Sequence, residues 1–215
     1  NDNELLIQNK YSLISSGTEK FLIEFSKSSF FNKVIKNKDR VKQVLNKMKS
    51  EGVISTLRKV DNKLNQPFRL GYSSAGIVIG KGKNIKNYKI GDKVISNSYH
   101  SEIAISSENL CALIPHGVKY EEAIFCIPGS IALHSIRLAK PTIGENFLVI
   151  GLGLIGQLCM QILQANGCNT IGIDINPNKV KTALDNNHLA LKFNKDVNKK
   201  IITNFDKDQV DGIIF

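Results

Sequence analysis

Residues 145–174, with the sequence ENFLVIGLGLIGQLCMQILQANGCNTIGID, constrain the fold more than any other segment of the chain. An apolar strand over 147–150 runs directly into a glycine-rich turn, and a helical pattern follows until Gly167. A second predicted strand ends in Asp174, eighteen residues after the last glycine of the turn. A strand, glycine turn, helix and strand in this order are typical of a parallel α/β sheet that binds a dinucleotide at the turn.

Each glycine of this turn has a distinct mechanical purpose. Gly151 permits the tight turn, Gly153 lets the backbone approach a pyrophosphate, and Gly156 lets the helix pack closely. The helix that follows begins at Leu154 and Ile155, where unpaired N–H groups and the positive end of the helix dipole favour phosphate. We therefore expect these five positions to bind the cofactor.

Asp174 bears on which dinucleotide is bound. A carboxylate at the end of the second strand is placed to accept hydrogen bonds from the adenosine ribose. The same charge repels a 2′-phosphate, residues 175–178 contain no Arg, and Lys179 is the only nearby cation. We predict NAD as the cofactor, with NADP less favoured.

The remaining chain divides into a β-rich part and an α/β part. Residues 4–15 alternate as one or two strands that end at a turn, SSGTE, and strands return over 75–82 and 93–106. Apolar residues at helical spacing predict helices over about 20–66 and again over 120–140. We predict a mixed α/β fold with a β-rich domain over 1–118, carrying a helical insert at about 20–66, and a dinucleotide-binding domain over 119–215.

The last predicted strand, VDGIIF, would be the fourth of the parallel sheet. A doubly wound dinucleotide domain has about six strands. We therefore expect that domain to be incomplete at its C-terminus and the chain to be a fragment of a longer protein.

Composition excludes some classes of protein and leaves one question open. The net charge of +10 is concentrated between Lys20 and Lys63, a stretch that contains twelve basic and four acidic residues. This basic stretch is either a solvated helical face or a phosphate-binding surface. The four cysteines form no CxxC pair, which predicts reduced thiols, no structural zinc and a cytoplasmic location. No apolar run is long enough to span a membrane.

Four segments together resemble a known family: SLISSGTE, LGYSSAG, GDKV and LHSIRLAKPTIGENFLVIGLGLIG. They resemble the medium-chain dehydrogenase/reductase superfamily and, more narrowly, the zinc alcohol-dehydrogenase-like half of bacterial bi-domain oxidoreductases. The resemblance implies a GroES-like catalytic domain followed by a Rossmann domain. The insert at 20–66 fits the narrower group.

The resemblance also implies where a catalytic zinc would lie. Zinc-dependent members carry a metal-binding Cys at the position of Ser16, and a His followed by a Glu at the positions of Tyr72 and Ser73. A third ligand, often Cys, corresponds to Cys126. Neutral hydroxyls are poor zinc ligands, so we predict that no metal is bound.

Without zinc, other groups must polarise a carbonyl and move a proton. Tyr72 is either a proton donor or a packing residue, and Thr18 lies where the family places a hydroxyl of a proton relay. Ser16 and Ser73 either contact substrate or satisfy the turn backbone. By resemblance to the family, Ser130 corresponds to a position beside the nicotinamide of the cofactor.

The resemblance implies a zinc-free, NAD(P)-dependent oxidoreductase that acts on a hydroxyl or carbonyl substrate, with a sugar or sugar nucleotide as one possibility. The alternative is a non-catalytic dinucleotide-binding or docking half of a larger bi-domain protein. We expect no nucleic-acid or membrane partner, and a homo-oligomer is possible in the full-length protein. His134, in an apolar helical pattern, is expected to be a core residue.

Overall fold

A computed structural model describes residues 1–27, 69–205 and 210–215. The chain forms two compact units, one from Asn1–Leu13 with Tyr72–Phe215 and one from Ile14–Gly71. Most of the helical insert predicted for 20–66 lies outside the described residues.

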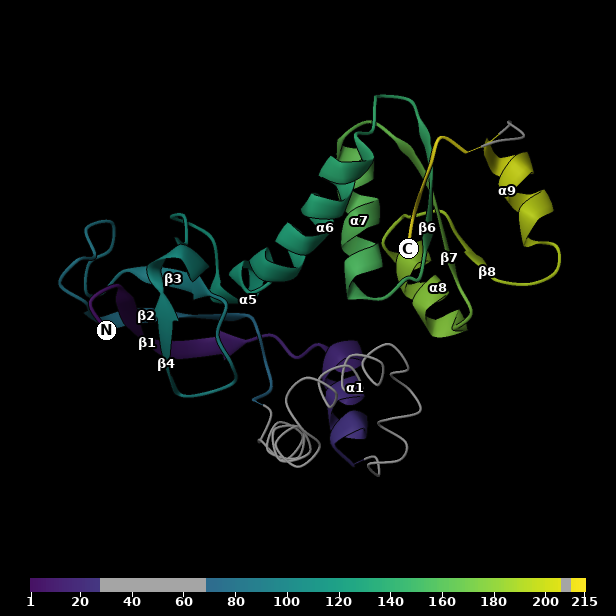
Figure 1. The fold of residues 1–215 in the computed structure, drawn as a ribbon. Helices are drawn as coiled ribbons and strands as arrows, with labels where there is room; N and C mark the ends of the chain where they lie inside the picture. Colours follow the sequence, from purple (N-terminus) through teal and green to yellow (C-terminus); the bar gives the residue numbers. More distant parts are fainter. Residues whose placement is uncertain (28–68, 206–209) are drawn as a thin grey trace, which may run out of the picture. The chain divides into compact units, whose positions relative to one another are not determined.

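The N-terminal part of the larger unit is a five-stranded antiparallel sheet with the strand order β4-β1-β2-β3-β5 (Figure 1). A short 3-10 helix, Glu108–Leu110, precedes the last of these strands. Along β1, Leu5 and Ile7 are buried while Leu6 is exposed, so one face of the sheet forms the core. The strands are β1 (Glu4–Ser12), β2 (Ser74–Lys81), β3 (Lys93–Ser96), β4 (Ile103–Ser107) and β5 (Cys111–Leu113).

The segment SSGTE is the start of a helix, so the prediction of a turn there was wrong. Helix α1 spans Ser16–Lys27 in the smaller unit. The Oγ of Ser15 contacts Thr18 Oγ1 at 3.2 Å, and the backbone N–H of Ser15 donates to Glu19 Oε1 at 3.0 Å. Polar side chains therefore pair with the groups at the first turn, which stabilises a helix start where composition alone favours a turn.

The C-terminal part of the larger unit is a four-stranded parallel sheet with the order β8-β7-β6-β9. Numbered from β6, this is the 3-2-1-4 order of a Rossmann fold. The prediction of a fourth strand near the end of the chain is confirmed by β9. The short strand β8 and helix α9 had no clear sequence signal. The elements are β6 (Asn146–Ile150), α7 (Leu154–Ala165), β7 (Asn169–Asp174), α8 (Pro177–Asp185), β8 (Ala190–Lys192), α9 (Val197–Phe205) and β9 (Gly212–Ile214).

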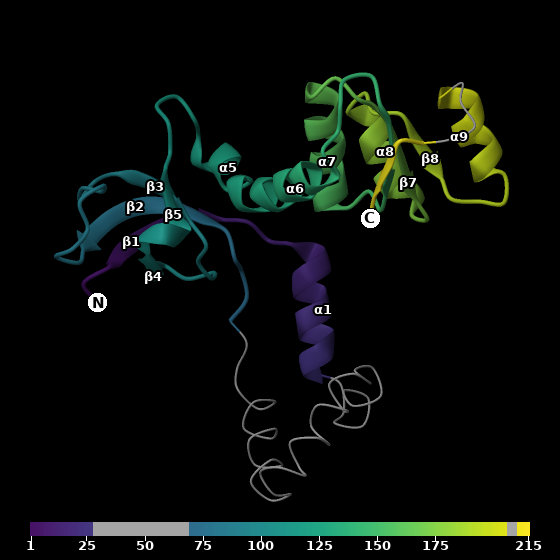
Figure 2. The same cartoon turned by 45° about the horizontal axis from the view of Figure 1, so that its top comes forward.

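Two helices lie between the two sheets in chain order and confirm the helices predicted over 120–140. They are α5 (Tyr120–Ala123) and α6 (Cys126–Ala139). Helix α6 packs along α7, as Figures 1 and 2 both show. The buried face of α6 runs through Pro128, Ala132 and Ile136. His134 lies outside this face and is exposed, so the prediction of a core histidine was wrong.

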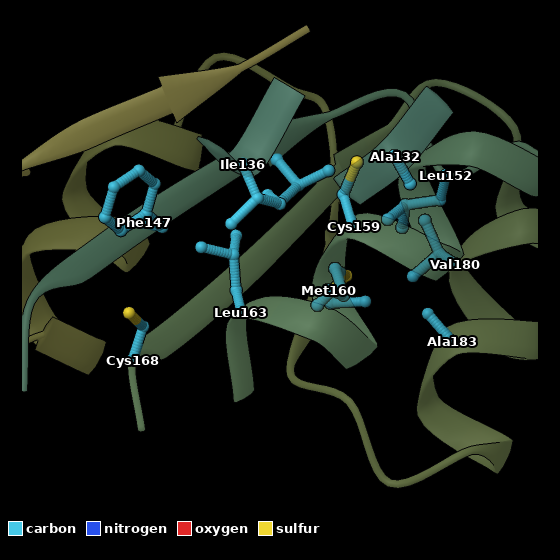
Figure 3. Close-up of a cluster of buried hydrophobic side chains, with 12 residues drawn as sticks. Ala132, Ile136, Phe147, Leu152, Cys159, Met160, Leu163, Cys168, Val180 and Ala183 are labelled. Carbon is cyan, nitrogen blue, oxygen red and sulfur yellow. The ribbon is translucent and has the colours of Figure 1, made fainter. Parts of the chain in front are cut away.

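Helices cover both faces of the parallel sheet. On one face, residues of α6, α7 and α8 pack against Phe147 and Val149 of β6 (Figure 3). On the other face, Val197 and Ile201 of α9 pack with Leu148. Burial on both faces explains why these strands are continuous apolar runs in the sequence. In the part of the chain that the structure describes, no helix has the length and apolar character needed to cross a bilayer.

Candidate dinucleotide-binding site

The turn after β6 has a backbone that only glycine adopts readily. Gly151 has φ +96°, and its N–H donates to the carbonyl oxygen of Ile173 at 2.7 Å. A side chain at this φ would be strained, so the glycine is required for the turn. Gly153 then forms the N-cap of α7.

The other two glycines of the turn differ in what surrounds them. A Cβ at Gly156 would collide with the carbonyl oxygen of Gly151, so the start of α7 rests directly on the turn. A Cβ at Gly153 would meet no atom within 4 Å. Because the N-cap has no side chain, the first N–H groups of α7, at Leu154 and Ile155, receive no side-chain cap. An open glycine beside an uncapped helix N-terminus fits a pyrophosphate.

Asp174 holds this turn in place. The side chain is 7% exposed; its Oδ2 accepts from the N–H of Leu152 at 2.8 Å, and its Oδ1 accepts from the N–H of Asn176 at 2.8 Å. Burial acts to raise the pKa of Asp174, but the hydrogen bonds from Asn176 and Leu152 and the charge of Lys179 outweigh it, so the pKa lies below its ordinary value. A carboxylate has about four acceptor positions, so Asp174 retains capacity for a ribose hydroxyl.

Lys179, the cation that the sequence places near Asp174, forms an ion pair with it. Its Nζ lies 3.7 Å from Asp174 Oδ2, and the Lys179 side chain is 49% exposed. Helix α8 positions it: Asn176 caps the helix by accepting from the N–H of Asn178 at 2.9 Å, and Pro177 is the first helical residue. The negative charge at the end of β7 is therefore partly neutralised.

Two candidate hydroxyls at the start of β2 have different surroundings. Ser73 is fully buried, and its Oγ donates to the carbonyl oxygen of Ile124 at 2.6 Å. Tyr72 is half-buried, and its hydroxyl has no hydrogen-bond partner among the described residues. Of the two, only Tyr72 has a hydroxyl that is available to a ligand.

Four further candidates are exposed at helix starts or on a helix surface. Ser16 and Thr18 lie in the first turn of α1, in the smaller unit, where Thr18 pairs with Ser15. Ser130 lies on α6 and its Oγ donates to the carbonyl oxygen of Ile127 at 2.7 Å. Cys126, also exposed, is the first residue of α6. Across residues 1–27, 69–205 and 210–215, no three His, Cys, Asp or Glu side chains gather closely enough to hold a metal.

A row of hydroxyls across the antiparallel sheet escaped the sequence reasoning. Ser12, Ser74 and Ser96 are register partners on β1, β2 and β3. His100 Nδ1 lies 2.8 Å from Ser12 Oγ. The serines are separated by at least 22 residues in the sequence, so only the strand register brings them together.

Comparisons with known proteins agree with the fold. No model of a protein family matches the sequence. The chain is 29% identical over 154 residues to D-guloside 3-dehydrogenase of Escherichia coli K12, a match that covers 68% of this chain and 44% of that enzyme. It spans similar shares, 42% and 43%, of a butanediol dehydrogenase from Bacillus subtilis and a sorbitol dehydrogenase from Saccharomyces cerevisiae. The chain thus spans less than half the length of these relatives.

Solved structures show the same fold. A putative zinc-binding dehydrogenase from Clostridium scindens superposes with a TM-score of 0.73 at 19% identity, over 99% of this chain and 61% of that one. The quinone oxidoreductase of Escherichia coli, solved with NADPH, superposes with a TM-score of 0.63 at 20% identity, over 97% and 56%. The fold is the GroES-like and Rossmann arrangement of medium-chain dehydrogenases. These relatives and neighbours confirm the resemblance to the medium-chain dehydrogenase/reductase superfamily.

Proposed function

We propose that the protein is an NAD(P)-dependent oxidoreductase that moves a hydride between a nicotinamide and a hydroxyl or carbonyl group of a small substrate. The turn at Gly151–Gly156 carries the proposal. It combines an open glycine, an uncapped helix N-terminus and a buried carboxylate, Asp174, at the end of the next strand. Dehydrogenases among the relatives support the same class of reaction.

The chain's own residues fit the dinucleotide. The N–H groups of Leu154 and Ile155 would bind the pyrophosphate, and Asp174 would accept hydrogen bonds from the adenosine ribose. The bound nicotinamide would supply or accept the hydride. The ionised Asp174 favours NAD over NADP, and Lys179 moderates that preference by partly neutralising the carboxylate.

The chemical step is proposed to need no zinc, because by the family resemblance Ser16, Tyr72 and Ser73 correspond to metal-ligand positions of zinc-dependent members, and neutral hydroxyls are poor ligands. Tyr72 is the best candidate to hydrogen-bond the substrate oxygen, since its hydroxyl is unpaired among the described residues while that of Ser73 is bound to Ile124. Thr18, by resemblance, would pass a proton onward.

The substrate is proposed to be a polyol or sugar-like molecule. Relatives are named for guloside, sorbitol and butanediol, all of which carry at least two hydroxyl groups. The four thiols, Cys111, Cys126, Cys159 and Cys168, are free in the structure, which supports the proposal that the protein works in the reducing cytoplasm.

A second candidate is a dinucleotide-binding half of a bi-domain protein with no catalysis of its own. One observation favours it: the Ser73 hydroxyl already donates to the carbonyl oxygen of Ile124, and Thr18 Oγ1 already accepts from the Ser15 hydroxyl. Such a module needs the Gly151–Gly156 turn and Asp174 but no reacting hydroxyl.

An NADH titration, monitored by NADH fluorescence and by thermal unfolding, tests the proposal. The chain contains no Trp, so protein emission from tryptophan does not interfere with the NADH signal. We expect enhanced NADH emission and a melting temperature that rises with NADH, since a ligand that binds only the folded state stabilises it. Absence of both effects would contradict dinucleotide binding. Binding without turnover of any polyol in an oxidation assay would instead favour the non-catalytic module.

A further inference from the structure

A polar hollow lies at the opposite end of the parallel sheet from the glycine turn. Its lining includes Asn146 and Asn169, which are the first residues of β6 and β7, whereas the glycine turn and Asp174 lie at the other ends of these strands. The hollow has a volume of about 410 Å³. We call it the amide hollow, after the carboxamides of Asn146, Gln164, Asn169, Asn187 and Asn204 that line it together with Phe205.

Hydrogen bonds within the chain orient several of these carboxamides. Asn169 Nδ2 donates to Asn146 Oδ1 at 3.0 Å, and Gln164 Nε2 donates to Thr170 Oγ1 at 2.9 Å. His188 Nδ1 lies 2.8 Å from Gln164 Oε1. The amide hollow is therefore built on fixed side chains, and a ligand would not have to order all of them on binding.

The same network leaves specific polar atoms unused. Asn146 is 2% exposed, yet its side-chain N–H₂ has no partner among the described residues. The carbonyl oxygens of the Asn169 and Asn204 side chains and the whole carboxamide of Asn187 are likewise unpaired within that part of the chain. The free N–H₂ of Asn146 is available to an acceptor in the hollow. The hollow thus offers both donors and acceptors.

The chemistry of the lining selects the class of ligand. Among the described residues, those that line the amide hollow carry no charge, so they offer no counter-charge to a phosphate or carboxylate. A hydroxyl group both donates and accepts, and so pairs equally well with a free N–H₂ and a free carbonyl. Phe205 and Leu189 add an apolar surface for C–H groups.

We propose that the amide hollow binds a neutral, polyhydroxylated molecule of monosaccharide size. Its volume lies near the lower end of the range for small-molecule pockets, which suits such a ligand. The site is separate from the glycine turn, so this proposal stands or falls independently of dinucleotide binding.

The test is an NMR titration of the ¹⁵N-labelled 215-residue chain with D-glucose and with D-sorbitol. We expect the side-chain N–H₂ signals of Asn146, Asn187 and Asn204 to shift with a dissociation constant of about 1–10 mM, as a ligand of this size allows. The backbone N–H of Gly153 reports on the glycine turn and should stay unmoved at the same sugar concentration.

Matched variants on one helix sharpen the test. Asn204→Leu removes a lining carboxamide and should weaken binding at least fivefold, whereas Asn198→Leu, at an exposed position of α9 outside the hollow, should leave the affinity unchanged. Asn146→Asp, which replaces the free N–H₂ by oxygen, should abolish binding. Three results would overturn the proposal: an affinity for sugar that Asn204→Leu leaves unchanged, no change in chemical shift with either sugar, or changes with adenosine but not with either sugar.

Discussion

The backbone N–H of Leu152 donates to Asp174 Oδ2 at 2.8 Å, which ties the glycine turn to the end of the neighbouring strand. Leu152 is 2% exposed, so this N–H has no access to water in place of the carboxylate. Asp174 is therefore a structural residue of the turn as well as the proposed ribose ligand. Its two tasks are coupled, because the turn that binds phosphates depends on the same side chain.

Asp174→Ala should destabilise the protein. It leaves the buried N–H of Leu152 without a partner and removes the acceptor of Asn176, and one unsatisfied buried donor costs about 1–3 kcal/mol. Urea unfolding followed by circular dichroism measures the loss. Asp185→Ala, at an exposed position of α8, is the control and should change stability by less than about 0.5 kcal/mol. Equal effects of the two changes would contradict a structural role for Asp174.

Cofactor preference should follow the charges at the end of β7. Asp174→Ala should lower the ratio of NAD to NADP affinity by about tenfold, which corresponds to about 1.4 kcal/mol, because the repulsion of a 2′-phosphate is removed. Lys179→Met should raise the same ratio, since it unmasks the carboxylate. Each ratio is measured within one variant by competitive titration, so a change in overall stability cancels. A ratio that stays constant in both variants would argue against this account.

Two substitutions in the turn should separate packing from ligand contact. Gly156→Ala places a Cβ against the carbonyl oxygen of Gly151 and should destabilise the fold by about 1–3 kcal/mol or more. Gly153→Ala meets open space at φ −74°, so it should fold normally yet weaken NAD binding by crowding the phosphate. Thermal unfolding and NADH titration of both proteins check the pattern. Undiminished NADH binding by Gly153→Ala would contradict the proposed phosphate position.

Local sequence signals predicted the parallel sheet well because each was short-range and physically specific. The glycine turn, the apolar strands and the Asn176–Pro177 helix start are each determined by residues that lie close together in the sequence. The start of α1 shows the limit of this reasoning. Its composition resembles a turn, and the contacts of Ser15 with Thr18 and Glu19 stabilise a helix start there.

Contacts between distant residues could not be predicted from one sequence. The hydroxyl of Ser73 pairs with Ile124 across 51 residues, and the His188 contact with Gln164 spans 24. Because such pairs depend on how elements pack, the sequence left Ser73 open between substrate binding and backbone contact. The amide hollow was missed for the same reason, since its carboxamides come from separate strands and helices.

Removing two hydroxyls should decide whether the β-rich part takes part in catalysis. Tyr72→Phe should lower kcat by about 10²–10⁴-fold if its hydroxyl assists proton transfer, with little change in NADH affinity. Thr18→Val should lower kcat by a smaller factor if it serves only to relay the proton. Ser130→Ala, whose hydroxyl is occupied by the carbonyl oxygen of Ile127, serves for comparison. Unchanged turnover in both Tyr72→Phe and Thr18→Val would favour the non-catalytic module.

His188 gives the fold a dependence on pH that can be measured without any ligand. The side chain is 6% exposed, with Nδ1 2.8 Å from Gln164 Oε1. Burial lowers the pKa of His188 from its ordinary value of about 6.5. The neutral imidazole is therefore preferred in the folded state, whereas the unfolded chain accepts a proton more readily.

Because the pKa of His188 is lower in the folded state than in the unfolded state, protonation favours unfolding. The contribution to stability is complete above about pH 6.5 and is lost as the pH falls through the folded-state pKa. We expect the free energy of unfolding to decrease between pH 7.5 and 5.5, by at most about 1.4 kcal/mol per pH unit from this one group. His188→Gln should flatten that decrease, while His134→Gln, at an exposed position, should preserve it. The pKa of Asp174 lies below its ordinary value, so Asp174 does not titrate in this range, and a decrease that survives His188→Gln would refute the assignment.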